Sequence, residues 1–237
     1  MNGPVETLLF DFGGTLDANG VAWKERFHAL YRGEGVDMEG DAFAPVYYAA
    51  DDPLVGTLPP ATNLAETVHA LVANLERELA GQHDWHCATS PESGADRPGR
   101  IATGFLTEAN AAFDRNRPIL KVLSDRYRLG IVSNFYGNLE AVCESAGLCS
   151  YFKVMVDSYC VGADKPDPAI FRSALERLDA TPETTVLIGD SLRRDGEGAH
   201  RMGMSFIWIA PEHVLAGEQR SKVEYAVSDL RDLAKFL

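Results

Sequence analysis

The chain has 237 residues, 46% of them hydrophobic and 24% charged, which is the composition of an ordinary globular protein with room for a substantial core. A formal net charge of −13 argues against nucleic acid and anionic membranes as partners, because both attract basic surfaces. No apolar run is long enough to span a bilayer, and residues 1–4 do not resemble a signal peptide, so we expect a cytoplasmic protein without a membrane partner. The four cysteines form no paired framework, which favours free thiols, and we expect a monomer or a homodimer.

The chain begins with an apolar run, Thr7–Phe10, that predicts a buried strand. This strand delivers Asp11 at its carboxyl end and is followed by Gly13 and Gly14, which let the backbone turn sharply and approach a ligand closely. Parallel α/β sheets bind their ligands at the carboxyl ends of the strands. Asp11 is therefore the first candidate for a functional site.

Residues 18–117 differ from this opening, because their hydrophobic pattern is that of amphipathic helices without a convincing strand. A polar loop from 81 to 99 is long enough to be functional and not a simple connector. It contains His83, His86 and Cys87, but their spacing lacks the second ligand pair of a typical zinc site. The helices of this segment are expected at Ala22–Tyr31, Ala42–Ala50, Leu64–Leu79 and Ile101–Phe113.

From Pro118 onward, strands and helices alternate, and the strands are continuously apolar. This alternation predicts a parallel sheet covered by helices on both faces. We expect helices at Ile119–Arg126, Leu139–Ala146, Pro168–Leu178 (capped by Asp167) and Arg194–Met202, strands at Leu129–Ser133, Lys153–Val156, Thr185–Ile188 and Ser205–Ile209, and a strand–helix pair from Tyr225 to Leu237. Because the first strand belongs with this half, residues 1–17 and 118–237 are expected to form a doubly wound α/β core, with the helical segment 18–117 inserted after the first strand.

Two further polar motifs lie at a strand end and at a helix start. Ser133 and Asn134 end a predicted strand, where a hydroxyl can hold a phosphoryl oxygen with help from the next backbone amide. Pro166 and Pro168 stiffen the loop that carries Lys165, so its ammonium would be fixed where it could neutralise a carboxylate and a phosphate. Taken singly, Ser133 and Asn134 are more often ordinary turn residues, and Lys165 is more often a solvated loop lysine.

The last motif places Asp190 at the end of an apolar strand, with Asp195 five residues later. These carboxylates would repel each other and Asp11 at the same sheet edge unless a cation lay between them. Oxygen ligands of this kind suit Mg²⁺. Asp195 could also simply cap the helix that follows.

In this order, the motifs resemble those of the haloacid dehalogenase-like hydrolase superfamily, and the resemblance covers the whole sequence. It implies a Rossmann-like core with residues 18–117 as a helical cap. It also implies a Mg²⁺-dependent hydrolase that acts on a small phosphorylated metabolite through an aspartyl-phosphate intermediate on Asp11. The motifs that carry it are Asp11–Thr15, Ser133–Asn134, Lys165–Pro166, and Gly189–Asp190 with Asp195.

The resemblance also assigns roles around the phosphate. Ser133 would bind the transferring group, with Asn134 and Gly14 as further phosphate-binding residues. Lys165 would bind phosphate, orient Asp11 and offset its charge.

On the metal side, the resemblance implies that Mg²⁺ is held by Asp11, by Asp190 and by the backbone carbonyl of Gly13. Asp195 would bind the ion or support the other ligands.

Substrate specificity would come from the cap. Trp23 and Arg26, on its first helix, are the residues we expect to set it. Tyr47 and Tyr48 are expected to pack inside the cap.

Gly13 departs from the phosphatase pattern, because the aspartate usually found there protonates the leaving oxygen. General acid–base help of this kind is worth roughly 10²–10⁴ in rate. Without this acid, the hydrolysis of alkyl phosphates would slow strongly, because an alkoxide is a poor leaving group. Acyl, aryl and enol phosphates would be affected less. Another group could take over the role, and the cap offers four histidines, His28, His69, His83 and His86.

The glycine also brings other reactions into view. The 2-haloacid dehalogenases lack an acid at this position, but they work without Mg²⁺ and do not show the motif Gly189–Asp195. Hydrolases that cleave a C–P bond need a cap lysine, and the only one here is Lys24. A scaffold that binds phosphate without turnover is the remaining alternative, and we rank all three below phosphate hydrolysis.

Overall fold

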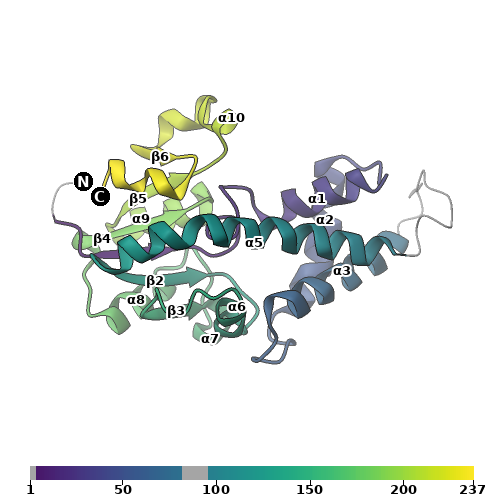
Figure 1. Ribbon diagram of the computed structural model, residues 1–237, viewed down its shortest axis with the longest axis horizontal. Coiled ribbons are helices and arrows are strands. Elements are labelled where there is room, and N and C mark those ends of the chain that lie inside the picture. The colour runs from purple at the N-terminus through teal and green to yellow at the C-terminus, as the bar shows by residue number, and fades with distance from the viewer. Residues whose placement is uncertain (1–3, 82–95) are drawn as a thin grey trace.

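The structure is a computed structural model that describes residues 4–81 and 96–237. Six parallel strands form a sheet in the order β3-β2-β1-β4-β5-β6 (Figure 1). Their bounds are β1 Thr7–Phe10, β2 Arg128–Ser133, β3 Val154–Asp157, β4 Thr185–Gly189, β5 Ser205–Ile209 and β6 Tyr225–Val227. The strand order reverses direction between β1 and β4, which is where ligands bind in doubly wound folds. The predicted fold class is confirmed.

The helices fall into two groups (Figure 1). Between β1 and β2 the chain forms α1 Trp23–Gly33, α2 Gly40–Asp51, α3 Leu64–Ala80 and α5 Arg97–Ser124, which we call the helical insert. The others are connections of the sheet: α6 Leu139–Ser145, α7 Ser158–Val161, α8 Pro168–Leu178, α9 Glu197–Met202 and α10 Glu212–Leu215. Among the described helices, none combines the length and the apolar character needed to cross a membrane.

The expected helix break at Pro118 is wrong, because α5 is one helix of 28 residues that passes through this proline. Proline removes a backbone donor and crowds the preceding turn, so the local rule favours an end there. Phe113 and Leu120 on either side are fully buried, and α5 contacts both α3 and β2. Packing along the whole length therefore outweighs the local cost, and α5 crosses the predicted boundary between residues 117 and 118.

Two other predicted helices differ from the structure in their helix type. The expected helix from Arg194 begins with a π-helical turn, Leu192–Gly196, before α9 starts. The expected C-terminal helix is a 3₁₀ segment, Leu230–Lys235, that follows β6. Asp167 caps α8 as predicted, since its carboxylate accepts a hydrogen bond of 2.8 Å from the amide of Ala169.

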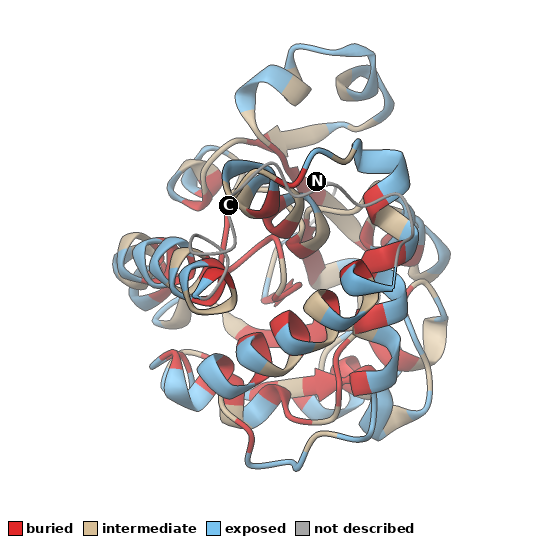
Figure 2. Cartoon of the chain, turned by 90° about the vertical axis from the view of Figure 1, so that its right-hand side faces the viewer, coloured by how far each residue is buried: buried red, intermediate tan, exposed pale blue. Residues whose placement is uncertain are grey.

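The core is divided by the sheet, because successive side chains of a strand point to opposite faces. Leu8 and Phe10 of β1 join a large cluster that continues into the helical insert, whereas Leu9 packs with the residues beneath α8 and α9. Inside the insert, the rings of Phe27 and Phe105 stack with centroids 4.4 Å apart. Figure 2 shows the buried residues on the inward faces of strands and helices.

Gly20 fixes the chain where it leaves β1 for the insert. Its φ is +78°, and its amide donates a hydrogen bond of 2.8 Å to the carbonyl of Gly14. A Cβ at this position would overlap Cα of Ala210, a backbone atom that can move only if the strand end moves with it. Only glycine fits both the dihedral and the space.

We expect Gly20→Ala to lower the free energy of unfolding by at least about 2 kcal/mol, because it adds left-handed strain to a steric overlap. Gly33→Ala at the end of α1 is the matched control, since nothing lies within 4 Å of its added methyl group. That control should keep the wild-type stability or gain up to about 1 kcal/mol. Urea denaturation followed by circular dichroism measures both, and equal losses would contradict the prediction.

Candidate active site

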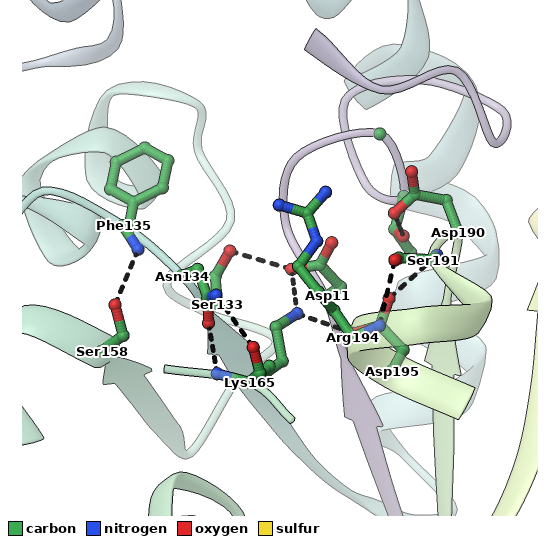
Figure 3. A network of polar contacts seen from close by, with 12 residues as sticks. Asp11, Ser133, Asn134, Phe135, Ser158, Lys165, Asp190, Ser191, Arg194 and Asp195 are labelled. Carbon is green, nitrogen blue, oxygen red and sulfur yellow. Dashed lines mark hydrogen bonds and ion pairs between the residues drawn. The ribbon is translucent and has the colours of Figure 1, made fainter. Parts of the chain in front are cut away.

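The carboxyl ends of β1 and β2 bring the first predicted site residues together (Figure 3). Asp11 follows β1 directly, and Ser133 is the last residue of β2, the neighbouring strand. The Ser133 hydroxyl donates a hydrogen bond of 2.9 Å to Oδ1 of Asp11. Both side chains are almost entirely buried. Adjacent parallel strands thus set the geometry of this pair.

Lys165 lies between two carboxylates. Its Nζ is 2.6 Å from Oδ1 of Asp11 and 2.7 Å from Oδ1 of Asp195, and the ammonium is buried. Burial would raise the pKa of Asp11, but the charge and hydrogen bond of Lys165 hold it below its usual value. Burial would lower the pKa of Lys165, but the two aspartates raise it. Asp11 is therefore an anion near neutral pH, the form in which a carboxylate is able to act as a nucleophile.

The loop of Lys165 is fixed by Asn134. Oδ1 of Asn134 accepts a hydrogen bond of 2.7 Å from the Lys165 amide, and its Nδ2 donates one of 3.3 Å to the Lys165 carbonyl. Asn134 was predicted to bind phosphate, and it does line the cavity described below. Its amide group, however, is used to position the lysine.

Asp11, Asp190 and Asp195 form the acidic cluster that the motif spacing predicts, with ligand atoms within 4.8 Å of one another. Asp195 is fully buried and is held by Lys165 and by the Ser191 amide, 3.0 Å from its Oδ2. It does not cap the following helix α9, whose N-cap is Gly196 and has no side-chain cap.

Asp190 has a weaker partner, a hydroxyl of Thr15 at 3.4 Å. Burial and the negative charges of Asp11 and Asp195 raise the pKa of Asp190 well above its usual value. The cluster thus holds more negative charge than Lys165 and Arg194 neutralise. Hard oxygen donors with excess negative charge fit a divalent cation such as Mg²⁺.

Gly13 lies against the indole of Trp23. A Cβ on Gly13 would be 3.2 Å from Nε1 of Trp23, and this nitrogen donates a hydrogen bond of 2.7 Å to Oδ2 of Asp17. The space beside Gly13, on the side where a side chain would start, is therefore occupied by a held aromatic ring. The Trp23 ring, and not solvent, therefore lies where a side chain of residue 13 would begin.

Arg26 and Gly14 are not brought to the positions that we predicted. Arg26 is buried, with Nη1 2.7 Å from Oδ2 of Asp17 and Nη2 3.0 Å from the carbonyl of Phe105, and it does not line the cavity. The Gly14 amide donates to Oδ1 of Asp17 at 2.7 Å and so is not free for a phosphate. A fully buried carboxylate needs hydrogen-bond donors and a cation, and Asp17 binds both the Gly14 amide and the Arg26 guanidinium. Sequence reasoning did not single out Asp17.

A cavity of about 300 Å³ opens between the sheet edge and the helical insert. Its floor contains Asp11, Ser133 and Lys165, with Arg194 beside them (Figure 3). Its other walls are largely aromatic and acidic: Trp23, Lys24, Glu25, Tyr47, Tyr48, Asp51, Asp52, Phe135, Tyr136 and Asp164.

Several of these residues were missed by sequence analysis. Tyr47 and Tyr48 were expected to pack inside the insert. Tyr47 does so, at 5% exposure in the core cluster, and it also lines the cavity, whereas Tyr48 lines the cavity and is 47% exposed. Asp51, Phe135 and Tyr136 had no recognisable motif. The position of Phe135 and Tyr136 directly after Ser133 and Asn134 was the one available signal, because residues after a strand end face the ligand edge.

The histidines considered as replacement acids are placed elsewhere or are not described. His28 has Nε2 2.7 Å from the Met38 carbonyl and packs on Phe43. His69 is exposed and does not line the cavity. His83, His86 and Cys87 lie outside the described residues.

The fold and the site together define an α/β protein with a cluster of carboxylates at the switch point of its sheet. The family model of the haloacid dehalogenase-like hydrolases matches residues 5–203, and the chain belongs to this family. It is 32% identical over 171 residues to glyceraldehyde 3-phosphate phosphatase of Methanothermobacter thermautotrophicus, an alignment that covers 67% of this chain and 74% of that one.

Two solved structures show the same fold. The HAD-hydrolase YfnB of Bacillus subtilis, bound to magnesium, aligns with a TM-score of 0.58 and 20% identity over 99% of both chains. A dehalogenase solved as an intermediate complex aligns with a TM-score of 0.63 and 17% identity, covering 100% of this chain and 99% of that one.

We expect Arg26→Met to lower the free energy of unfolding by about 3–5 kcal/mol, because it leaves the buried Asp17 carboxylate without its cation. Glu108→Gln is the matched control. Glu108 is the exposed partner of Arg26, 3.2 Å from its Nε, and its loss should cost less than about 1 kcal/mol. Denaturation midpoints in urea report both, and a change below about 1 kcal/mol for Arg26→Met would show that Asp17 needs no ion pair.

Proposed function

We propose that the protein is a Mg²⁺-dependent phosphatase that hydrolyses a small phosphorylated metabolite through nucleophilic attack by Asp11. The observation that carries this proposal is the Asp11 carboxylate, which is held by Ser133 and Lys165 at the floor of a cavity beside an acidic cluster. The similarity to a phosphatase of a three-carbon phosphate supports the substrate class. Residues 18–117 would act as the cap that selects the substrate, with the boundary drawn inside α5.

The chain's own residues suffice to describe the chemistry. Oδ1 of Asp11 is occupied by Ser133 and Lys165, so Oδ2 is the oxygen that would attack phosphorus. Lys165 and the Ser133 hydroxyl can then follow the developing charge onto the phosphoryl oxygens. Burial would lower the pKa of Arg194, but Asp11 and the neighbouring aspartates raise it, so this cation remains available for the substrate phosphate. Water would hydrolyse the aspartyl phosphate and release inorganic phosphate.

The residues that would hold Mg²⁺ are Asp11, Asp190 and the Gly13 carbonyl. Asp195, engaged by Lys165 and Ser191, would support them. When bound, the ion would supply positive charge for the phosphoryl oxygens. Without it, the excess negative charge of the cluster would repel an anionic substrate.

C–P bond hydrolysis is a second candidate, because Lys24 lies in the cavity. Its Nζ is 3.4 Å from Glu25 and 5.7 Å from the ring centroid of Tyr48. A lysine at this place could form a Schiff base with an aldehyde substrate. Phosphate hydrolysis ranks first, since it uses every member of the buried cluster.

We expect Asp11→Asn to reduce phosphatase turnover at least about 10³-fold, because the amide is a poor nucleophile and no other described carboxylate is placed to replace it. Asp125→Asn, which removes the same charge from the exposed surface, is the control and should keep wild-type turnover. Phosphate release is the assay, and circular dichroism checks that both variants are folded. Retained turnover in Asp11→Asn would exclude Asp11 as the nucleophile.

A substrate panel separates the reaction classes. Acyl, aryl and alkyl phosphates, a 2-haloacid and phosphonoacetaldehyde are each assayed with Mg²⁺ and with chelator. We expect phosphate release that requires Mg²⁺. Halide release in chelator would instead identify a dehalogenase, and phosphonoacetaldehyde cleavage that Lys24→Met abolishes would identify a C–P hydrolase. A scaffold would turn over none of them.

A further inference from the structure

We propose that Asp51, at the end of α2 in the helical insert, is the general acid and base of the reaction, in place of the carboxyl group that Gly13 lacks. The proposal rests on the proposed phosphatase function. It assigns the proton transfers to a residue that lies 40 positions further along the chain than Asp11 and on a different element.

The position of Asp51 is the first argument. It lines the cavity whose floor contains Asp11, Ser133 and Lys165. Three more acidic residues line this cavity among those described, namely Glu25, Asp52 and Asp164, and all three are exposed. Asp51 is the partly buried one, so it can be held in place and shielded from bulk water. Both are requirements for a proton donor that acts on one atom.

The carboxyl group of Asp51 is fixed by the core. The Tyr136 hydroxyl donates a hydrogen bond of 2.5 Å to Oδ1 of Asp51, and the Tyr136 carbonyl accepts one of 2.9 Å from the Gly56 amide. Tyr136 lies three residues after Ser133 on the same loop. The loop that holds the phosphoryl-binding hydroxyl therefore also holds the insert carboxyl group.

The electrostatic surroundings suit the role. Burial raises the pKa of Asp51 to about 6, and the charge of Asp52 adds to this, whereas hydrogen bonds from Tyr136 and Tyr47 and the charge of Arg194 oppose it. The charge of Arg194 also lowers the pKa of Asp11, so this guanidinium lies within electrostatic range of both carboxyl groups. A phosphate held by Arg194 would therefore lie in the cavity that both Asp11 and Asp51 line.

The proposed step balances as follows. Oδ2 of Asp11 forms a bond to phosphorus while the bond from phosphorus to the leaving oxygen breaks. The leaving oxygen takes that electron pair and the proton of the Asp51 carboxyl group, giving a free alcohol and a carboxylate. In the second step this carboxylate takes a proton from the water that attacks phosphorus. The bond between phosphorus and Asp11 breaks, inorganic phosphate leaves, and Asp51 is again protonated.

The test compares two leaving groups on Asp51→Asn. We use benzyl phosphate and 4-nitrophenyl phosphate, which are both aromatic but leave as a basic alkoxide and as a stabilised phenolate. For kcat/KM, which reports the first transfer, we expect benzyl phosphate to lose about 10²–10⁴-fold and 4-nitrophenyl phosphate less than about 10-fold. Because water activation is also impaired, the variant should release nitrophenol in a burst equal to the enzyme concentration. Glu25→Gln, which removes an exposed carboxylate of α1 from the same cavity, is the matched control and should keep the ratio of the two kcat/KM values.

The pH profile gives an independent readout. With benzyl phosphate, wild-type kcat/KM should fall above about pH 6, because the acid form of Asp51 is lost there. Tyr136→Phe removes a hydrogen bond that lowers this pKa, so the fall should move to higher pH, and in Asp51→Asn it should be absent. The substrate's own ionisation is common to all three enzymes and cancels in the comparison. Lys24, Glu25 and Asp52, the other charged residues of the insert in the cavity, are unchanged in all of them.

Equal losses on both substrates, or no loss, in Asp51→Asn would overturn the assignment of Asp51 while leaving the phosphatase function in place. A wild-type enzyme that hydrolyses neither ester with Mg²⁺ would overturn the proposed function itself.

Discussion

The active site depends on a buried ammonium between two buried carboxylates. Lys165 contacts Asp11 at 2.6 Å and Asp195 at 2.7 Å, and each of these groups would be costly to bury alone. Their mutual contacts join the loop after β1, the loop before α8 and the π-helical turn after β4. The position of each segment is therefore tied to the same charge. Asp190 has no cationic side chain of the described residues in contact with it, and the charge of its carboxylate form is what makes the cluster suitable for a divalent cation.

A second buried charge pair accounts for the unusual opening loop. Asp17 is bound by the Gly14 amide, by the Trp23 indole and by Arg26, and the indole lies over Gly13. The glycine and the tryptophan thus form one packing unit. A side chain at position 13 would press on a ring that a buried carboxylate holds, because its Cβ would lie 3.2 Å from Nε1 of Trp23. The absence of an acid at this position is built into the surrounding structure.

The insert and the core share the cavity, and the two are joined by more than the chain. The helix α5 runs without a break from beside α3 to the start of the strand β2, which ends in Ser133. Tyr136 of the core bonds Asp51 of the insert. In the proposed mechanism the nucleophile therefore comes from the sheet edge, whereas Asp51 and Tyr136 come from the insert and from the loop after β2. This division explains how one core can serve different substrates.

The sequence by itself determined the sheet and the buried part of the site. The strands Thr7–Phe10 and Ser205–Ile209 have the predicted bounds, because continuous apolar runs between turn residues have few alternatives. Asp11, Ser133, Lys165, Asp190 and Asp195 were identified because each lies at a strand end or a helix start. The carboxyl ends of parallel strands meet at one edge.

Tertiary structure alone decided the rest. Pro118 predicts a helix end by a local rule, but burial on both sides keeps α5 continuous. Arg26 has a side chain that could bind an anionic substrate, yet its guanidinium forms an ion pair with the buried Asp17. Asp51 and Tyr136 carry no motif, since they are 85 positions apart and meet only where α2 packs against the loop after β2. Local pattern fixes which groups end at the sheet edge, whereas long-range packing fixes which groups face them across the cavity.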